Sequence, residues 1–418
     1  VKDKSLYSLV VLRFVIAAMK ILCLMFNIIT ISIGNPTNLD YVKAVRVLDT
    51  HPLIDGHNDF PYNLLRLRRN KLEGFDFYDL TSVEPWASDE SSFTDLKRLR
   101  AGKVGAQFWV VYLDCSHQYA DAVQWAYEQI DVIKRLATKF SADLEFVTTT
   151  QGIEDAFQRG KIASLVGVEG GHLIGSSLGV LRTMYELGAR YLTLTHNCNT
   201  PWADQSGKDR PGNEPEFNGL TLFGMDIVRE MNRLGMLIDL SHVSSTTMHD
   251  ALTVSRSPVI FSHSGARSVC DHPRNVPDDV LFRLAQNKGI VMVVFYPGFS
   301  ACASTATMED VIAHIEYIRN LIGVDFIGIG GDYDGVSSAP VGLEDVSKYP
   351  SLFAELSFRG WTEEELVKLA GGNFLRVMRE AEKVKLDMES EGVQPYEDMI
   401  DEDEVLSRSN CSVPRPLF

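Results

Sequence analysis

Six apolar runs of the β type in this 418-residue chain each end in an acid or a histidine. The runs are IDGHND (54–59), LVGVEG (165–170), LTLTHN (192–197), LIDLSH (237–242), VIFSHS (259–264) and IGIGGDYD (327–334). Because parallel strands of a barrel deliver the residues at their carboxyl ends to one rim, we expect these polar groups to meet. Imidazole nitrogens and carboxylate oxygens bind zinc and similar divalent ions, so the pattern predicts metal-assisted chemistry.

Five of these polar residues are the candidate metal ligands. His57 and Asp59 lie two positions apart, so an extended backbone places both side chains on one face. Glu169 closes a strongly apolar run, where a buried carboxylate must be paired, protonated or bound to a metal. His242 and His263 end consecutive predicted strands at equivalent positions, which favours shared ligation over two separate structural histidines. Since a single catalytic zinc usually has three protein ligands, five candidates predict two metal ions that share one carboxylate.

Paired metal ions make hydrolysis the expected reaction class. Two ions about 3.5–4 Å apart generate a bridging hydroxide and polarise a carbonyl or phosphoryl oxygen. Asp332 ends the last predicted strand, beside the first in a closed barrel, and is expected to bind a metal or move protons. His196 ends another strand and is either a site residue or a hydrogen-bonded structural histidine, whereas Asp334 is expected to brace a turn. The remaining histidines considered, read as surface or loop residues, are His172, His249, His272 and His314.

The positions of these residues require a set of parallel strands. Eight apolar strands are predicted at residues 52–57, 105–113, 163–169, 191–196, 236–242, 258–263, 289–295 and 326–332. Helical periodicity separates most of them, at 120–140, 152–160, 178–187, 221–234, 245–251, 278–286 and 308–322. This alternation favours an α/β fold with a (β/α)8 TIM-like barrel over a doubly wound open sheet, which would gather its functional groups at one switch point.

The chain is predicted to have a signal region at 1–34, a barrel domain at 38–385 with an extra C-terminal helix at 362–384, and an acidic tail at 386–418. With 45% hydrophobic and 23% charged residues, the composition is that of an ordinary globular protein. The net charge of −16 and the absence of a long basic run argue against nucleic acid or an anionic membrane surface as a partner.

The apolar N-terminal stretch predicts an extracellular protein, secreted or at the cell surface. Met19-Lys20 followed by ILCLMFNIITISIG has the pattern of a compact signal peptide, so Met19 is a candidate for the true start. An uncleaved anchor is the alternative, although the run after Lys20 is short for a membrane span, which needs about 20 residues. Either interpretation places the rest of the chain outside the cytosol.

The number and spacing of the cysteines are consistent with an extracellular protein. Among the six cysteines there is no CxxC pair, which argues against a cysteine zinc site. Once Cys23 leaves with the signal, the other five predict two internal disulfides and one cysteine left over, with a connectivity that these residues do not fix. Cys411 lies in the tail, within the glycosylation signal Asn410-Cys411-Ser412.

Seven segments together resemble the membrane dipeptidase, or renal dipeptidase, family of zinc metallopeptidases. The resemblance extends over residues 47–384 and rests on LIDGHNDFP, GVEGGH, YLTLTHNCNTPWAD, LIDLSHVS, PVIFSHS, RNVPDD and GGDYDGV in this order. It implies an extracellular dipeptidase with two Zn²⁺ per subunit that hydrolyses dipeptides with a free C-terminal carboxylate. The alternatives are a binuclear-metal barrel hydrolase acting on another small amide or lactone, and a catalytically idle binding protein on the same scaffold.

The resemblance also implies a ligand set and disulfides. It divides the ligand candidates between two zinc ions, with His57 and Asp59 on the first, His242 and His263 on the second, and Glu169 bridging both. The family's bridges correspond to Cys115 with Cys198 and to Cys270 with Cys302. Cys411 resembles a tail cysteine that links two subunits, so the resemblance implies a homodimer that this cysteine could link.

Three further residues receive roles from the resemblance. His196 would steady the oxyanion of the tetrahedral intermediate. Arg274 would receive the terminal carboxylate of the substrate, since its planar fork matches a carboxylate. Asp332 would take a proton from the attacking water and pass it to the leaving amine. Many relatives end in an apolar tail that directs a GPI anchor, and no such signal is visible before the final PRPLF, which leaves free secretion or a C-terminus beyond this sequence.

Overall fold

The computed structural model of this protein describes residues 35–401, 403, 405 and 407–409. The chain divides into a short unit, Val1–Pro36, and a large unit, Thr37–Phe418, and the fold below is that of the large unit. The predicted signal region, Cys411 and its glycosylation signal lie outside the described residues. Among the described residues, no helix is both long and apolar enough to cross a membrane.

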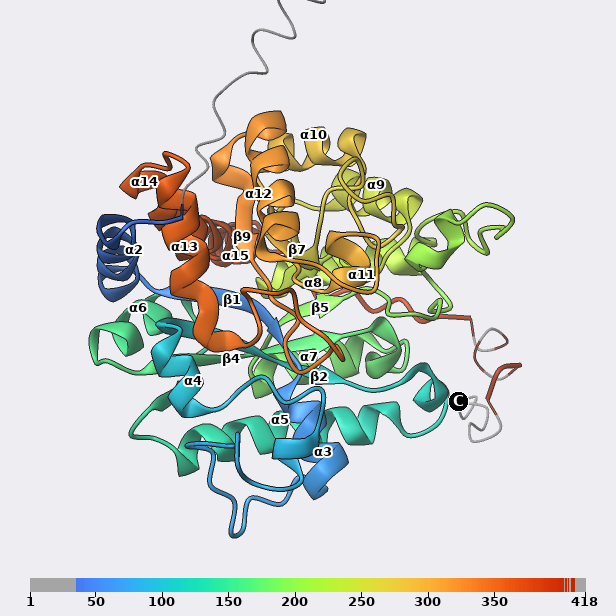
Figure 1. Ribbon diagram of the computed structural model, residues 1–418. Coiled ribbons are helices and arrows are strands. Elements are labelled where there is room, and N and C mark those ends of the chain that lie inside the picture. The colour runs from blue at the N-terminus through green and yellow to red at the C-terminus, as the bar shows by residue number, and fades with distance from the viewer. Residues whose placement is uncertain (1–34, 402, 404, 406, 410–418) are drawn as a thin grey trace, which may run out of the picture. The chain divides into compact units, whose positions relative to one another are not determined.

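Eight parallel strands close into a barrel, which confirms the predicted (β/α)8 fold (Figure 1). Closure is made by β2, which pairs with β1 on one side and with β4 on the other. A ninth short strand, β3, pairs with β4 alone and was not expected from the sequence. The strands are β1 (Leu53–Asn58), β2 (Val104–Tyr112), β3 (Leu144–Phe146), β4 (Ile162–Glu169), β5 (Ala189–Thr193), β6 (Leu237–Asp239), β7 (Ile260–Ser264), β8 (Ile290–Val293) and β9 (Ile327–Ile329).

Helices surround the barrel, and several begin at a side-chain cap. The side chains of Thr149, Ser177, Thr221 and Ser244 each accept a backbone N–H in the first turn of the helix that follows, which satisfies a donor that the helix itself leaves free. The helices are α2 (Asn38–Thr50), α3 (Phe60–Arg68), α4 (Leu96–Ala101), α5 (Ala122–Lys139), α6 (Thr150–Gln158), α7 (Leu178–Leu187), α8 (Leu222–Leu234), α9 (Ser245–Val254), α10 (Asp278–Asn287), α11 (Pro297–Ser300), α12 (Met308–Ile322), α13 (Tyr349–Phe358), α14 (Glu363–Val367) and α15 (Asn373–Ser390).

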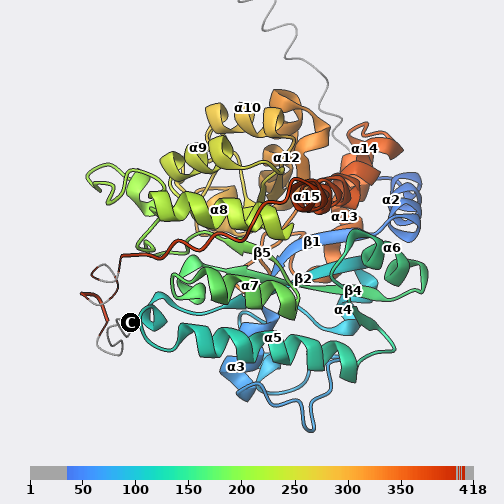
Figure 2. The same ribbon diagram turned by 180° about the vertical axis from the view of Figure 1, so that it is seen from behind.

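The predicted C-terminal helix forms α14, a π turn at Lys368–Gly372, and α15 (Figure 2). Buried residues of α15 join the core inside the barrel, where the ring of Phe374 lies 5.3 Å from that of Phe108 on β2. At Gly371 a β-carbon would come within 2.4 Å of the Pro52 carbonyl oxygen, so the absent side chain permits this close approach to the start of β1. The helix therefore packs against the amino end of the barrel and leaves the opposite rim open.

Three strands end three residues earlier than predicted. The predictions extended to residues 196, 242 and 332, whereas β5, β6 and β9 end at Thr193, Asp239 and Ile329. Two buried carboxylates explain the short pairings of β6 with β7 and of β1 with β9. Asp239 Oδ1 accepts the backbone N–H of Ser262 at 2.8 Å, and Asp55 Oδ1 accepts that of Gly331 at 3.0 Å. These side chains replace ladder hydrogen bonds, so the residues that follow leave the regular strand.

The segment after α15 crosses α8 and continues between α8 and α7 (Figure 2). Arg182 on α7 donates to the Tyr396 carbonyl oxygen at 3.0 Å, and the Tyr396 N–H donates to Glu230 of α8 at 3.2 Å. Glu230 is fully buried and also accepts two hydrogen bonds of 2.7 Å from Arg233. Burial raises the pKa of this carboxyl group, but the hydrogen bonds from Arg233 and Arg182 outweigh it and hold the pKa below its ordinary value.

Glu230→Gln is expected to lower the free energy of unfolding by about 2 kcal/mol at pH 7, because hydrogen bonds to a buried charge are lost. The pKa of Glu230 is lower in the folded state than in the unfolded chain, where it is about 4.3. The ionised carboxylate therefore stabilises the fold above about pH 4.3, and this stabilisation is lost as the pH falls through the folded-state pKa. The stability difference between wild type and variant should therefore shrink below pH 4, measured by denaturant unfolding. Glu391→Gln removes a half-exposed partner of Arg256 and serves as control. An equal difference at pH 3 and pH 7 would contradict this assignment.

Candidate metal centre and substrate cavity

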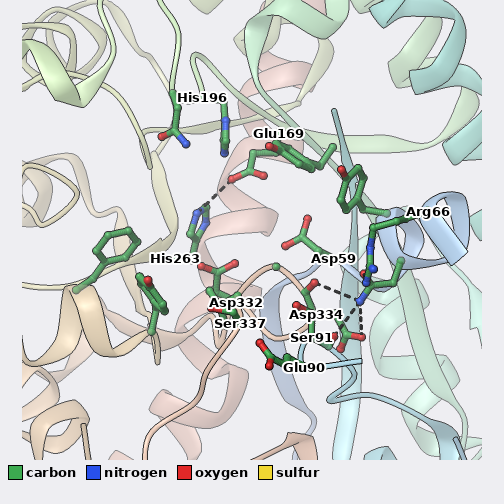
Figure 3. Close-up of a pocket in the computed structure, with 18 of the residues that line it drawn as sticks. Asp59, Arg66, Glu90, Ser91, Glu169, His196, His263, Asp332, Asp334 and Ser337 are labelled. Atoms are coloured by element: carbon green, nitrogen blue, oxygen red, sulfur yellow. Dashed lines mark hydrogen bonds and ion pairs between the residues drawn. The ribbon is translucent and has the colours of Figure 1, made fainter. Parts of the chain in front are cut away.

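The five predicted ligands meet at the carboxyl rim of the barrel around one atom, Glu169 Oε1. This oxygen lies 3.0 Å from His242 Nε2, 3.2 Å from His263 Nε2 and 3.6 Å from His57 Nε2. Asp59 Oδ2 lies 3.3 Å from His57 Nε2 on the other side. Figure 3 shows Glu169 pointing toward His263, with Asp59 across the cavity. Segments from four strands thus converge as the sequence predicts.

Unsatisfied polar atoms in this cluster indicate a place for cations. His57 Nε2 and Asp59 Oδ1 are buried without a hydrogen-bond partner among the described residues, a situation that costs about 1–3 kcal/mol per group. The Nε2 atoms of His242 and His263 face each other at 3.0 Å. Nitrogen and carboxylate donors in this arrangement fit a divalent ion such as zinc. Three sets of residues could each hold a metal ion, because the ligand atoms within each set lie within 4.8 Å of one another. The sets are His57 with Glu169 and His263, Glu169 with His196 and His242, and His57 with Asp59 and Asp332.

Hydrogen bonds at Nδ1 determine which ring nitrogen of His242 and of His263 is free to bind a metal. His242 Nδ1 lies 3.3 Å from Asn197 Oδ1, an oxygen that can only accept. His263 Nδ1 lies 2.9 Å from Ser262 Oγ, whose own proton goes to a carboxylate. Both rings therefore carry their proton on Nδ1 and present the Nε2 lone pair to the centre of the cluster. Burial lowers the pKa of both histidines well below the ordinary value, so the rings are neutral.

The Ser262 hydroxyl links the two halves of the cluster. It donates to Asp239 Oδ2 at 2.6 Å, accepts from His263 Nδ1, and lies 3.4 Å from His57 Nδ1. The hydroxyl of Tyr191, which donates to a backbone carbonyl, lies 3.2 Å from the same His57 nitrogen. The buried Asp239 carboxylate therefore orients the His263 ring through the Ser262 hydroxyl. The same hydroxyl also lies beside His57 Nδ1 and supports that ring.

Ser262→Ala is expected to weaken metal binding about 10- to 100-fold, the usual effect of losing a group that orients a ligand. The measurement is competition for the metal with a chelator of known affinity. Ser264→Ala is the matched control, since this buried serine lies on the same strand and its hydroxyl bonds to Ser241 rather than to a ligand. Wild-type metal affinity in the Ser262 variant would show that the serine does not orient the ligands.

His196, Arg274 and Asp332 lie around the same cluster. The His196 ring is buried with its centroid 4.2 Å from that of His242, and its Nδ1 has no partner among the described residues. Asp332 Oδ1 lies 3.9 Å from His57 Nε2, and burial raises the pKa of Asp332 well above its ordinary value. His242 and Asp332 both have positive φ angles, +67° and +61°, strain of the kind that concentrates at functional sites.

Arg274 is a buried cation with free donors. Its side chain is 4% exposed, and one terminal nitrogen donates to the His263 carbonyl oxygen at 3.3 Å. Nε and the other terminal nitrogen have no partner among the described residues. The guanidinium lies over the Phe299 ring at 5.0 Å, a favourable contact that leaves its edge available. Such an edge suits a carboxylate held in two hydrogen bonds.

These residues line one cavity of about 740 Å³ at the open rim (Figure 3). Arg274, Tyr296 and Phe299 form one part of its wall, and the segment Ser88–Ser91 forms another. Two disulfides brace the surrounding loops. Cys115–Cys198 joins the loops that follow β2 and β5, and Cys270–Cys302 joins the loop before Arg274 to the segment after α11. The cavity therefore has walls fixed by covalent links.

The structure corrects the prediction that His172 and His314 are surface or loop residues. His172 is buried, and its Nε2 lies 3.0 Å from the Leu113 carbonyl oxygen. His314 is fully buried in α12, where its Nδ1 accepts the Ala266 N–H at 2.8 Å. Both histidines brace loops beneath the rim. Asp334, which the sequence predicts to brace a turn, forms hydrogen bonds with Thr94 and Asn63.

Comparison with known proteins decides the family. The sequence profile of the membrane dipeptidases, peptidase family M19, matches residues 42–392. The chain belongs to the membrane dipeptidase family. Rat dipeptidase 3 is 49% identical over 343 residues, which cover 82% of this chain and 68% of the rat protein. Human dipeptidase 3 is 47% identical over 365 residues, with coverages of 87% and 72%.

Solved structures agree with this membership. The crystal structure of dipeptidase AC, described as a metallopeptidase, superposes with a TM-score of 0.70 at 25% identity and covers 79% of this chain and 99% of its own. This member of the membrane dipeptidase family is therefore a metallo-dipeptidase with an α/β barrel. The cluster around Glu169 is its candidate metal centre.

Proposed function

We propose that this dipeptidase is an extracellular zinc enzyme that cleaves the peptide bond of dipeptides carrying a free C-terminal carboxylate. Two zinc ions per subunit would be held by His57 and Asp59 on one side and by His242 and His263 on the other, with Glu169 shared. The single observation that carries this proposal is the approach of three histidine nitrogens to Glu169 Oε1 within 3.0–3.6 Å. Bound zinc ions would polarise the scissile carbonyl and make a water molecule nucleophilic near neutral pH.

The other residues of the cavity bind the substrate and move protons. Arg274 binds the terminal carboxylate through its free nitrogens and so limits the substrate to one residue beyond the scissile bond. His196 donates to the oxygen of the scissile carbonyl as negative charge develops there. Asp332 takes a proton from the attacking water and delivers it to the leaving nitrogen, which departs as a neutral amine.

The compartment and the assembly are part of the proposal. Two disulfides in the described chain support an oxidising environment, as expected for a secreted or surface protein. A homodimer linked through Cys411 accords with the family resemblance. Chromatography of the purified chain with and without reductant tests it.

Hydrolysis of Ala-Gly compared with Ala-Gly amide, with metal content measured on the same sample, tests the function. We expect about two metal equivalents and, since losing a buried charge pair costs at least 2 kcal/mol, a kcat/KM about 30-fold lower for the amide. Equal rates would favour a hydrolase of another small amide or lactone. Bound metal without hydrolysis of any dipeptide would favour a catalytically idle binding protein.

Arg274→Lys is expected to lower kcat/KM for Ala-Gly about 30-fold while metal content stays at the wild-type level. The lysine keeps the charge but loses the planar fork, which costs roughly 2 kcal/mol of carboxylate binding. The preference for the free acid over the amide should fall in parallel. Arg256→Lys, which retains a half-exposed pair with Glu391, is the control. An unchanged preference would remove Arg274 from the binding site.

A further inference from the structure

A second cavity, of about 600 Å³, adjoins the substrate cavity at its Arg274 end. The two cavities share Asn197, Arg274, Tyr296 and Phe299. Their charges differ. Six carboxylates line the first cavity, whereas none of the residues that line the second is acidic and two are arginines, Arg210 and Arg274. The second cavity is therefore a positively charged extension of the substrate site.

Three polar side chains of the second cavity, those of Arg210, His272 and Gln205, offer hydrogen-bond donors. The Arg210 guanidinium has no hydrogen-bond or ion-pair partner among the described residues, and the residue is exposed. His272 Nδ1 accepts the Arg274 N–H at 3.2 Å, so the neutral ring carries its proton on Nε2. Burial, followed by the charges of Arg274 and Arg210, lowers the pKa of His272 to about 4, so the ring is neutral at pH 7. Gln205 Oε1 accepts the Gly207 N–H at 2.6 Å, which leaves its amide NH₂ group as a donor.

The two walls of this cavity are tied together. Arg267 donates to Asp209 Oδ2 at 2.9 Å on the loop that carries Arg210, and to the Pro273 carbonyl oxygen at 3.1 Å on the opposite wall. Asp209 in turn accepts the Ser245 N–H at 3.1 Å, at the start of α9. The spacing between the walls is thus set before a ligand arrives, which reduces the entropy lost on binding.

We propose that this second cavity receives the side chain of the substrate's C-terminal residue and selects acidic ones, so that dipeptides ending in Asp or Glu are preferred. The inference rests on the proposed function, in which Arg274 holds the α-carboxylate. The shared Arg274 lies where the two cavities join, so the side chain borne by the same α-carbon enters the donor-lined cavity. A carboxylate there meets Arg210 together with the neutral donors of His272 and Gln205.

The test compares kcat/KM for Ala-Glu and Ala-Gln, two dipeptides of the same size that differ in one charge. Because the side chain of Ala-Glu gains one charge-assisted hydrogen bond, we expect kcat/KM of the wild type to be roughly tenfold higher for Ala-Glu than for Ala-Gln. Arg210→Gln should bring the ratio close to one, chiefly by lowering kcat/KM for Ala-Glu. Lys208→Gln removes the same charge from the same loop at a residue that does not line the cavity, and should preserve the preference.

Each outcome separates this inference from the function on which it rests. Equal kcat/KM values for the two dipeptides in the wild type, or a preference that survives in Arg210→Gln, would overturn the acidic subsite while leaving the dipeptidase intact. If Lys208→Gln lost the preference for Ala-Glu as fully as Arg210→Gln, the preference would come from the overall charge of the loop. That result would also overturn the acidic subsite. Failure to hydrolyse either dipeptide would overturn the proposed function itself, and the subsite with it.

Discussion

Glu169→Gln is expected to abolish binding of both metal ions and to lower kcat by at least about 10³-fold, because the metal ions supply several kcal/mol of transition-state stabilisation. Glu169 Oε1 is the atom that three histidine nitrogens share. The amide keeps the shape of the side chain but lacks the negative charge between the two proposed ion positions. Its NH₂ group also competes as a donor for the histidine lone pairs.

Metal content by elemental analysis, together with kcat for Ala-Gly, measures this effect. The unfolding temperature of the metal-free forms of variant and wild type checks that the barrel is intact. Glu145→Gln is the matched control, since Glu145 lies on β3 and pairs with Arg159 outside the site. Two bound ions in the Glu169 variant would contradict the shared-ligand assignment, even if activity fell.

Asp332→Asn is expected to keep both metal ions and to lower kcat about 10²- to 10⁴-fold, the range of a lost general acid–base group. The asparagine has nearly the same volume and cannot accept a proton from water at neutral pH. The proposed ligand set does not include Asp332, whose Oδ1 lies 3.9 Å from His57 Nε2, so we expect both ions to stay bound in the variant. KM should change little, since the substrate still binds through Arg274.

The control is Asp325→Asn, just before β9 at the opposite end of the strand that leads to Asp332, where the aspartate pairs with Lys368. Near-normal kcat in Asp332→Asn would rule out its proton role. Loss of metal from that variant would instead make Asp332 a ligand, which the sequence pattern allowed as an alternative.

Much of the fold follows from periodicity, because strands buried on both faces are continuous apolar runs and the helices between them show one apolar face. The metal cluster follows from where those runs end. The strand ends themselves could not be predicted: Asp55 and Asp239 look like ordinary polar residues in a run, yet their buried carboxylates replace ladder hydrogen bonds. The short β3 has too few residues to give a periodic signal.

Other parts of the site depend on contacts between distant segments. Arg274 sits in a loop sequence rich in charge and proline, where nothing local indicates that its side chain is buried against Phe299. Ser262 precedes a predicted ligand, but its function depends on Asp239 of the neighbouring strand. The burial of His314 could not be predicted from the sequence, because a helix in an outer layer can still turn one histidine toward the barrel loops.

Anomalous diffraction from crystals of the purified chain at the zinc absorption edge tests the central claim most directly. We predict two peaks about 3.5–4 Å apart, a separation typical of paired metal sites, with Glu169 between them, His57 and Asp59 at one peak and His242 and His263 at the other. A single peak, or peaks out of reach of Glu169, would contradict the account.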